Sequence, residues 1–373
     1  MNATRIAIIG GGVSGLYAAF SLEQRGIKDY VIFEAREVLG GRIVSAPANS
    51  DVALDDPAHG MNRFDLGPTW YWPTLQPQLH SLIRDLGLQR FEQFEKGDLL
   101  IERTPGVAPT RMPGYVNSPA SMRLSGGMAA LTDALLSHID PARVITGRAI
   151  RRLSIHGEQV ELSCEDSSGE ITAWSADHVL LAMPPRLVEH SILFAPVLPN
   201  SLALAWRNTP TWMASHAKYI AVYDSPFWRE LGLSGAAHSS HGPLTEIHDA
   251  SMLDGSAALF GFFGVPAPVR QGVSDAVLRS HCRAQFARLF GERAGSPKTE
   301  FIKDWAADPY TATARDMNSP AHHTAAPLAA VQSDPWRSRV TGVGSEWSPQ
   351  FPGYVAGAID AASSGVQRLL ESL

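Results

Sequence analysis

Apolar runs that alternate with helix-forming stretches organise the beginning of the chain. The run Ile6–Ile9 is apolar without interruption, as expected of a strand buried on both faces of a parallel sheet. The stretch Leu16–Leu22 has the composition of a helix and is followed by Gly26, and Tyr30–Phe33 is a second apolar run. This succession predicts a strand, a helix and a second strand, which form one βαβ unit.

The pattern beyond this unit predicts further helices and strands joined by polar connections. The stretch Ser45–Asn62 is polar, contains prolines and a glycine, and predicts a loop. Apolar residues at helical spacing predict helices at 75–86 and 274–290, and a last helix from Pro352. Strands are expected at 144–155, 159–164 and 176–183, around Lys218, and from Phe301 and Val340.

The turn after the first strand carries glycines at the spacing of dinucleotide-binding proteins. Gly10 permits a tight turn, Gly12 lets backbone amides approach a pyrophosphate, and Gly15 lets helix and strand pack closely. The helix N-terminus at Ser14 then faces the anion. Glu34 ends the second strand, where a carboxylate accepts hydrogen bonds from ribose hydroxyls and repels a 2′-phosphate. The unit predicts NAD or FAD as its ligand and argues against NADP.

A second glycine turn, Gly40-Gly41-Arg42, follows closely. Its glycines expose backbone amides, and Arg42 can fork onto phosphate oxygens. Through these residues the chain resembles the flavin-containing amine oxidase family, in which the first fingerprint is followed by E-A-R-x-x-x-G-G-R. The matching residues are Glu34, Ala35, Arg36, Gly40, Gly41 and Arg42. The resemblance implies FAD as the cofactor.

Further blocks carry the same resemblance. Phe64–Trp72 matches the family segment that passes beside the isoalloxazine ring, with Pro68 in place of the second glycine. The resemblance implies that Trp70 is a flavin neighbour, whereas core packing is the favoured expectation for Tyr71 and Trp72. The segment 123–131 resembles the stretch where the chain returns to the flavin domain. The cofactor contacts that these blocks and the following strand imply are Gly67, Pro68, Thr69 and, through its backbone, Ile150.

Lys218 stands in a segment, Thr209–Trp228, that has a lysine ahead of an apolar strand and P-F-W after it. Its side chain alternates onto the face of Ile220 and Val222, an unusual place for an ammonium group. The pattern alone favours a lysine that guards an edge strand. The resemblance reverses this preference, because the family's lysine holds a water against flavin N5, and it implies a catalytic role for Lys218.

Two C-terminal blocks resemble the most specific marks of the family. The residues Val340–Trp347 predict a strand and turn, and Pro352–Ala358 predicts the start of the last helix. In the family this helix directs its positive end at flavin N1 and the C2 oxygen, where negative charge gathers on reduction. Tyr354 is expected to present its ring in front of the isoalloxazine, with core packing as the alternative. The implied cofactor contacts are Gly344, Ser345, Glu346, Trp347 and Val355.

Composition restricts the classes of partner. The chain has 373 residues, 45% hydrophobic and 18% charged, which is typical of a folded protein with room for two domains. A net charge of −6 and a pI near 6.1 do not indicate the basic surface that nucleic-acid binding requires, so nucleic acid is not expected as a partner. No apolar run is long enough to span a bilayer. The first strand starts so early that no signal peptide is expected, and the prediction is a soluble, cytoplasmic protein.

Cysteine and histidine usage refines this picture. Only two cysteines occur, Cys164 and Cys282, without metal spacing, which suits a reducing cytoplasm. Because no cysteine follows Cys282, non-covalent FAD is expected. The histidines at 238, 241 and 248 match no metal-ligand spacing and predict a solvated loop, so no metal is expected.

The fold class expected is α/β, an FAD-binding Rossmann-like domain of the GR2 type with a smaller α+β substrate domain. The resemblance divides the chain into FAD-binding segments 1–76, 121–205 and 335–373 and substrate segments 77–120 and 206–334. The stretch between Gly87 and Ser121 is much shorter than the one that forms the roof of the substrate cavity in membrane-bound members of the family, which suggests a reduced roof.

By analogy with the family, the expected reaction oxidises a C–N bond of a small amine. Hydride passes to flavin N5, the imine is hydrolysed, and dioxygen reoxidises the flavin with release of hydrogen peroxide. A C–C desaturase, a redox-silent flavin-binding isomerase or structural protein, and a nicotinamide dehydrogenase stay open as alternatives. Neither the particular amine nor the oligomeric state is indicated.

Overall fold

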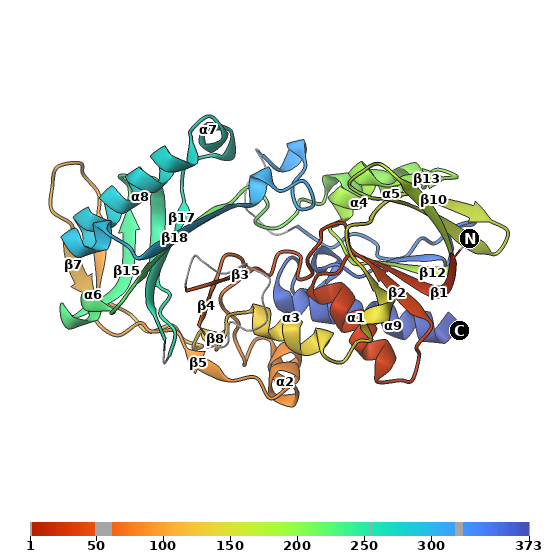
Figure 1. The fold of residues 1–373 in the computed structure, drawn as a ribbon, viewed down its shortest axis with the longest axis horizontal. Coiled ribbons are helices and arrows are strands. Elements are labelled where there is room, and N and C mark those ends of the chain that lie inside the picture. Colours follow the sequence, from red (N-terminus) through yellow and green to blue (C-terminus); the bar gives the residue numbers. More distant parts are fainter. Residues whose placement is uncertain (1, 49–61, 254, 318–323, 373) are drawn as a thin grey trace.

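The computed structural model describes residues 2–48, 62–253, 255–317 and 324–372. Two β-sheets lie side by side along the long axis of the molecule (Figure 1). The eight-stranded sheet has the order β13-β10-β11-β12-β1-β2-β9, with β19 paired to β12. Its strands are β1 (Asn2–Ile9), β2 (Tyr30–Phe33), β9 (Val144–Ile145), β10 (Ala149–His156), β11 (Gln159–Glu165), β12 (Ile171–Leu181), β13 (Leu193–Ala195) and β19 (Val340–Gly342).

The centre of this sheet is parallel and buried on both faces. Strand β1 pairs in parallel with β2 and β12, so that Ile6 lies opposite Tyr30 on one side and His178 on the other. Helices pack against both faces, which explains why Ile6–Ile9 is uninterruptedly apolar. The helices of this part are α1 (Val13–Glu23), α2 (Pro77–Asp85), α3 (Ala129–Leu136), α4 (Pro185–Ser191), α5 (Asn200–Asn208) and α9 (Val355–Ser372).

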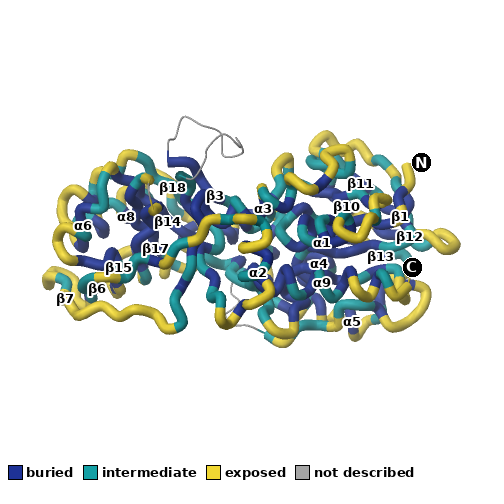
Figure 2. The backbone as a smooth tube through the Cα atoms, turned by 90° about the horizontal axis from the view of Figure 1, so that it is seen from below, coloured by how far each residue is buried: buried dark blue, intermediate teal, exposed yellow. Residues whose placement is uncertain are grey.

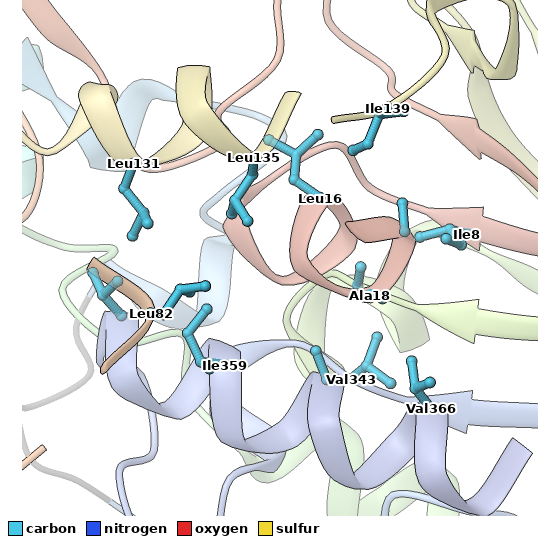
Figure 3. Packing of buried hydrophobic residues seen from close by; sticks show 14 of the residues in the cluster. Ile8, Leu16, Ala18, Leu82, Leu131, Leu135, Ile139, Val343, Ile359 and Val366 are labelled. Atoms are coloured by element: carbon cyan, nitrogen blue, oxygen red, sulfur yellow. The ribbon is translucent and has the colours of Figure 1, made fainter. Parts of the chain in front are cut away.

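One hydrophobic core unites helices from distant parts of the sequence. Figure 3 shows Leu16 of α1 beside Leu135 of α3, and Ile359 of α9 beside Leu82 of α2, within one cluster of buried residues. Each of these side chains is buried. The last helix is therefore fixed directly against the first helix of the βαβ unit, and its N-terminal end is brought to the edge where β1 ends.

The seven-stranded sheet forms the other part, in the order β18-β14-β17-β16-β15-β6-β7. Helix α8 covers one of its faces, and the buried positions fill the interior of both parts (Figure 2). Its strands are β6 (Asp98–Glu102), β7 (Thr110–Pro113), β14 (Ala217–Tyr223), β15 (Leu233–Ser239), β16 (Leu244–Asp249), β17 (Ala257–Phe263) and β18 (Thr299–Asp304). Its helices are α6 (Phe227–Glu230), α7 (Ala267–Gln271) and α8 (Asp275–Phe290).

Short elements connect the two parts. A separate buried cluster joins Phe64 of β4 to Ile220 and Phe260 of the seven-stranded sheet, which fixes the 64–70 segment against that sheet. The two-stranded pairs are β3 (Ser45–Pro47) with β4 (Arg63–Asp65), and β5 (Arg90–Glu92) with β8 (Met122–Leu124). The 3₁₀ turns are η2 (Pro141–Arg143), η3 (Glu292–Gly295), η4 (Trp305–Ala307), η5 (Ala314–Asp316) and η6 (Ser345–Trp347).

The α/β class with a Rossmann-like part is confirmed, and three local expectations are corrected. Ser45–Pro47, expected in a loop, is strand β3, and the positions 49–61 of that expected loop lie outside the described residues. The histidines expected in a solvated loop include His238 and His248, which belong to the paired strands β15 and β16. Lys218 does not lie on an edge strand, because β14 pairs with both β17 and β18.

In the described part of the chain, no helix has the length and apolar character needed to cross a membrane. Across the same ranges, no group of His, Cys, Asp and Glu side chains has the arrangement of a metal site.

Candidate active site

The turn between β1 and α1 depends on its glycines for two different steric reasons. Gly10 has a φ of +111°, a conformation that other residues rarely adopt, and a Cβ there would lie 2.6 Å from the carbonyl oxygen of Ala182. A Cβ on Gly15 would lie 2.0 Å from the carbonyl oxygen of Gly10. The tight turn and the close helix packing expected at these two positions are therefore visible in the backbone.

The N-terminus of α1 is open toward a cavity. Its N-cap is Gly12, so no side chain caps the helix, and its first turn has no acidic residue. The Gly40 amide donates to the carbonyl oxygen of Gly11 at 2.9 Å, which brings the second glycine turn against the first. The Ser14 hydroxyl donates to the carbonyl oxygen of Val343, so Ser14 offers its backbone to the cavity. Free amides at a helix N-terminus form a site for an anion such as a pyrophosphate.

Glu34 is held at the end of β2 with its carboxylate fixed by backbone amides. One carboxylate oxygen accepts from the Gly11 amide at 2.7 Å, and the other accepts from the Arg36 amide at 2.9 Å. The residue is 4% exposed. Each carboxylate oxygen has a second acceptor position, so the group can still bind ribose hydroxyls.

One continuous cavity runs from Glu34 to Lys218. It crosses the glycine turns, the 66–70 segment and the start of α9, which come from distant parts of the sequence. The residues predicted from the sequence that line this cavity are Gly10, Gly12, Ser14, Glu34, Ala35, Arg36, Gly40, Gly41, Arg42, Gly67, Pro68, Thr69, Trp70, Ile150, Lys218, Gly344, Ser345, Tyr354 and Val355.

Three predicted contact residues, Gly15, Glu346 and Trp347, lie behind the cavity wall. Trp347 is buried in the hydrophobic core, with its ring 5.7 Å from that of Trp206. Both oxygens of the Glu346 carboxylate accept from the guanidinium of Arg42, at 2.6 and 3.0 Å. The fork of Arg42, expected on phosphate oxygens, thus also joins the second glycine turn to the C-terminal block. The Arg42 guanidinium beside buried Glu346 holds the pKa of this carboxyl below its usual range, although burial alone raises it.

Lys218 is buried and surrounded by acceptors from one neighbouring segment. Its Nζ donates to the carbonyl oxygen of Asp65 at 2.6 Å, to the Thr69 hydroxyl at 2.6 Å and to the carbonyl oxygen of Gly67 at 3.3 Å. The Phe260 ring lies 4.0 Å from Nζ. These contacts attach the central strand β14 to the segment that lines the cavity.

The protonation of Lys218 is set mainly by its burial. Removal from water lowers its pKa to about 7, while the buried Asp65 nearby partly opposes this change and Arg123 adds to it. The residue is 2% exposed. Near neutral pH the amine can therefore exist with a free lone pair. In that state the Thr69 hydroxyl can rotate and donate to Nζ.

Aromatic rings enclose the cavity around Tyr354. The Trp212 ring lies 6.2 Å from that of Tyr354 at 33°, and the Trp72 ring lies 6.3 Å away at 82°. Trp70 also lines the cavity, with its ring nitrogen donating to Gln93 at 2.7 Å. The favoured expectation of core packing holds for Tyr71, which is fully buried, but is wrong for Trp72, which lines the cavity.

The sequence did not indicate several other wall residues. Met213 has a φ of +59°, which is unusual for a residue other than glycine. No local sequence pattern predicts its place in the cavity wall. The sequence predicts only a strand from Phe301, yet the segment after β18 also contributes wall residues. The unexpected wall residues include Trp212, Met213, His216, Phe262, Trp305, Tyr310 and Thr311.

Comparison with known families agrees with this architecture. Residues 99–370 match the family model described as flavin containing amine oxidoreductase, and residues 8–86 match an NAD(P)-binding Rossmann-like domain. The first match covers more than half of the chain. The chain therefore belongs to the flavin-containing amine oxidoreductase family.

Individual relatives are distant. A Mycobacterium tuberculosis protein named as a flavin-containing monoamine oxidase is 28% identical over 265 residues, which are 68% of this chain and 54% of the relative. Putrescine oxidase of Kocuria rosea is 26% identical over 205 residues, which are 51% of this chain and 41% of the relative. The chain thus spans about half the length of the curated relatives it matches.

Solved structures share the fold. A mutant of putrescine oxidase has a TM-score of 0.79 at 18% identity, with both chains covered to 100%. Cyclohexylamine oxidase from Brevibacterium oxydans has a TM-score of 0.78 at 18% identity, with both chains covered to 99%. At this identity the likeness shows the fold alone.

FAD is the cofactor expected in this family, and the cavity walls fit it. The uncapped N-terminus of α1 and the adjoining glycine turns suit a pyrophosphate, and the carboxylate of Glu34 suits a ribose. The cavity extends without interruption to Lys218 and Tyr354, so a long dinucleotide can reach both.

Proposed function

We propose that this protein catalyses the FAD-dependent oxidation of a C–N bond in a small amine. The observation that carries the proposal is the buried Lys218, with a lowered pKa, at the end of the cavity that begins at Glu34. A buried lysine with a displaced pKa in such a cavity is a candidate for proton transfer. Amine oxidation needs such a group, because the substrate must lose a proton as well as a hydride.

FAD, when bound, accepts the hydride from the carbon that bears the amine and passes the electron pair to dioxygen, which becomes hydrogen peroxide. The imine left behind reacts with water to give a carbonyl compound and the released amine or ammonia.

The protein residues orient the substrate and manage its protons. Tyr354, flanked by Trp72 and Trp212, provides aromatic faces against which an amine can pack. Lys218 in its neutral form can take a proton, directly or through water, and return it to solvent. Trp70 closes the wall beside Phe260, with their ring centres 5.5 Å apart. Closely packed aromatic walls exclude water and hold the reacting C–H in one orientation.

The wall at this end favours amines without a second charge. Among the described residues that line the cavity near Lys218, none has a carboxylate that would pair with a distal ammonium group. Arginines that line the cavity, such as Arg36 and Arg148, lie near the Glu34 end. We therefore infer that the preferred substrate is an amine with an apolar substituent.

The two cysteines and the division of the strands between the sheets bear on the expected non-covalent FAD and on the proposed segments. Both cysteines are buried and neither lines the cavity, and burial raises the pKa of Cys164 to about 12, which supports non-covalent FAD. The strands of the eight-stranded sheet fall in the three proposed FAD-binding segments, and those of the seven-stranded sheet fall in the two substrate segments. Helix α2 lies in the proposed substrate segment 77–120, yet its buried residues share one hydrophobic core with α9, so we place this helix with the FAD-binding part. A cytoplasmic location stays a prediction from cysteine usage.

The deciding test is the visible spectrum of the purified protein during anaerobic addition of amines. The panel contains an arylalkylamine, a secondary amine, a diamine, a polyamine and amino acids. We expect a flavin band that an apolar monoamine bleaches and that air restores with release of peroxide. A flavin band that no amine bleaches would overturn the proposal and favour the C–C desaturase or a redox-silent role. Bleaching by a diamine alone would contradict only the inferred substrate class.

A further inference from the structure

The segment that follows β18 connects the substrate sheet to the cofactor turn. Asp308 accepts a hydrogen bond from the Arg36 guanidinium at 2.6 Å and another from Lys303 at 2.9 Å. Arg36 also donates to the Thr311 hydroxyl at 3.3 Å, and its guanidinium carbon lies 5.2 Å from the centre of the Tyr310 ring. Residues 308–311 therefore hold a residue of the FAD-binding part from three directions.

This segment is also part of the cavity wall. Tyr310 and Thr311 line the cavity together with Arg36 and Glu34, so they stand at the end where the ribose carboxylate lies. Trp305, at the start of the same segment, lines the cavity as well, and its ring nitrogen donates to the carbonyl oxygen of Leu66 at 3.2 Å. One short stretch of chain thus borders the cavity at both ends.

The ion pair is sheltered from solvent. The side chains of Arg36 and Asp308 are 19% and 8% exposed. Although burial raises the pKa of the Asp308 carboxyl, Arg36 and Lys303 lower it below its usual value, so the group is charged. Charge-assisted hydrogen bonds of this kind are stronger than neutral ones, and salt screens a sheltered pair less than an exposed one.

We propose that residues 308–311 clamp the adenosine end of FAD, through the Arg36–Asp308 ion pair and the Tyr310 ring, and thereby set the rate at which FAD leaves. The inference rests on the FAD site of the proposed function. A cofactor without a covalent tether leaves only when the wall around it opens. Here opening the wall at the adenosine end requires Arg36 to separate from Asp308. The Rossmann-like unit alone would then bind FAD with a faster exchange.

The test measures cofactor exchange in the holoprotein without any substrate. Holoprotein is incubated with excess 8-chloro-FAD, and the replacement of bound FAD is followed through the spectrum of the protein fraction. We expect Asp308→Asn to exchange about tenfold faster than the parent protein, because removal of one partner of a sheltered charge pair acts on the dissociation rate. Asp308→Glu, which keeps the charge, should restore most of the slow exchange.

A matched control lies just beyond the end of β14, in the same part of the molecule. Asp224→Asn removes the ion pair with Lys298 at 3.2 Å, in which the Asp224 and Lys298 side chains are 84% and 60% exposed, and should leave exchange unchanged. If Asp308→Asn exchanges at the parent rate, or if Asp224→Asn accelerates exchange as much, the clamp is wrong. Should Asp308→Asn not fold, Tyr310→Ala takes its place with the same expected direction, and parent-like exchange again overturns the proposal.

A double substitution tests whether the pair acts as a unit. Arg36→Gln combined with Asp308→Asn should exchange no faster than the faster single variant, whereas multiplied effects would contradict a joint role. Because cofactor exchange does not require turnover, the proposed clamp and the proposed amine oxidation can be refuted independently of each other. A protein whose flavin no amine reduces can still show faster exchange in Asp308→Asn.

Discussion

The two ends of the cavity are built in contrasting ways. The glycine end is built mainly from residues 10–42, one continuous stretch that offers backbone amides at the start of α1, with Arg148, Tyr310 and Thr311 added from distant parts of the chain. The lysine end combines the 65–72 segment, β14, β17, the segment after β18 and the start of α9. It offers side chains, and the key one has a pKa lowered by burial to about 7.

The contrast shows which kind of change each end tolerates. At the glycine end the limiting property is space, because an added methyl group meets backbone atoms that have no alternative position. At the lysine end the limiting property is charge, because the group is 2% exposed and its hydrogen bonds to residues 65–69 replace water. The following substitutions separate these two properties, beginning with the largest expected effect.

Gly15→Ala should have the largest effect on the folded protein. Its Cβ would lie 2.0 Å from the Gly10 carbonyl oxygen, and overpacking against backbone costs on the order of 3 kcal/mol of unfolding free energy. Gly12→Ala is the matched control, since its Cβ meets nothing closer than the Gly41 Cα at 3.7 Å. We expect thermal unfolding of the apoprotein to show a large drop in Tm for Gly15→Ala and almost none for Gly12→Ala. Equal Tm values would remove the steric distinction between the two glycines.

Lys218→Met should retain FAD and lose turnover. Methionine fills similar space without a proton-transferring group, and loss of general acid or base catalysis lowers kcat by about 100-fold or more. Anaerobic flavin reduction and aerobic peroxide release would be measured separately, which shows whether the amine step or the oxygen step is slowed. Turnover at the parent rate under air would exclude a catalytic role for Lys218.

The pH dependence of kcat and of stability tests the lowered pKa of Lys218. Because the folded pKa of Lys218 is about 7, below its ordinary value of 10.5, the neutral amine prevails above neutral pH and kcat should rise through that region. Between about pH 7 and 10.5 Lys218 is protonated in the unfolded chain and neutral in the folded protein. The free energy of unfolding should therefore also rise with pH across this interval. Both slopes should be smaller in Lys218→Met. Identical pH profiles in the two proteins would contradict the lowered pKa.

Glu34→Ala should have the smallest effect of the three. It removes a ribose acceptor and leaves the amides of Gly11 and Arg36 without their carboxylate partner, so FAD should bind about tenfold more weakly. Titration of apoprotein with FAD, followed by quenching of flavin fluorescence, measures the dissociation constant. Glu37→Ala, at a neighbouring exposed position, serves as the control. Unchanged affinity in Glu34→Ala would contradict the ribose assignment.

The sequence by itself determined the glycine turns and Glu34 at the cofactor end, because these residues belong to one local unit. The spacing of Gly10, Gly12 and Gly15 and the position of Glu34 follow from the geometry of one βαβ unit, which neighbouring residues define. Strand β2 has the predicted bounds Tyr30–Phe33. Resemblance to the family added Lys218 and Tyr354, which residue patterns alone would have assigned to an edge strand or to the core.

Only the tertiary structure decided the remaining walls. Trp212 and Trp72 reach Tyr354, and Asp308 reaches Arg36, across separations in the chain that no local pattern spans. The place of Lys218 on a central strand depends on β18 pairing with β14. Helix and strand periodicities report on neighbours within one element, whereas these contacts arise from the packing of two sheets and the segments between them. The charge and enclosure of the lysine end are for that reason properties of the assembled fold.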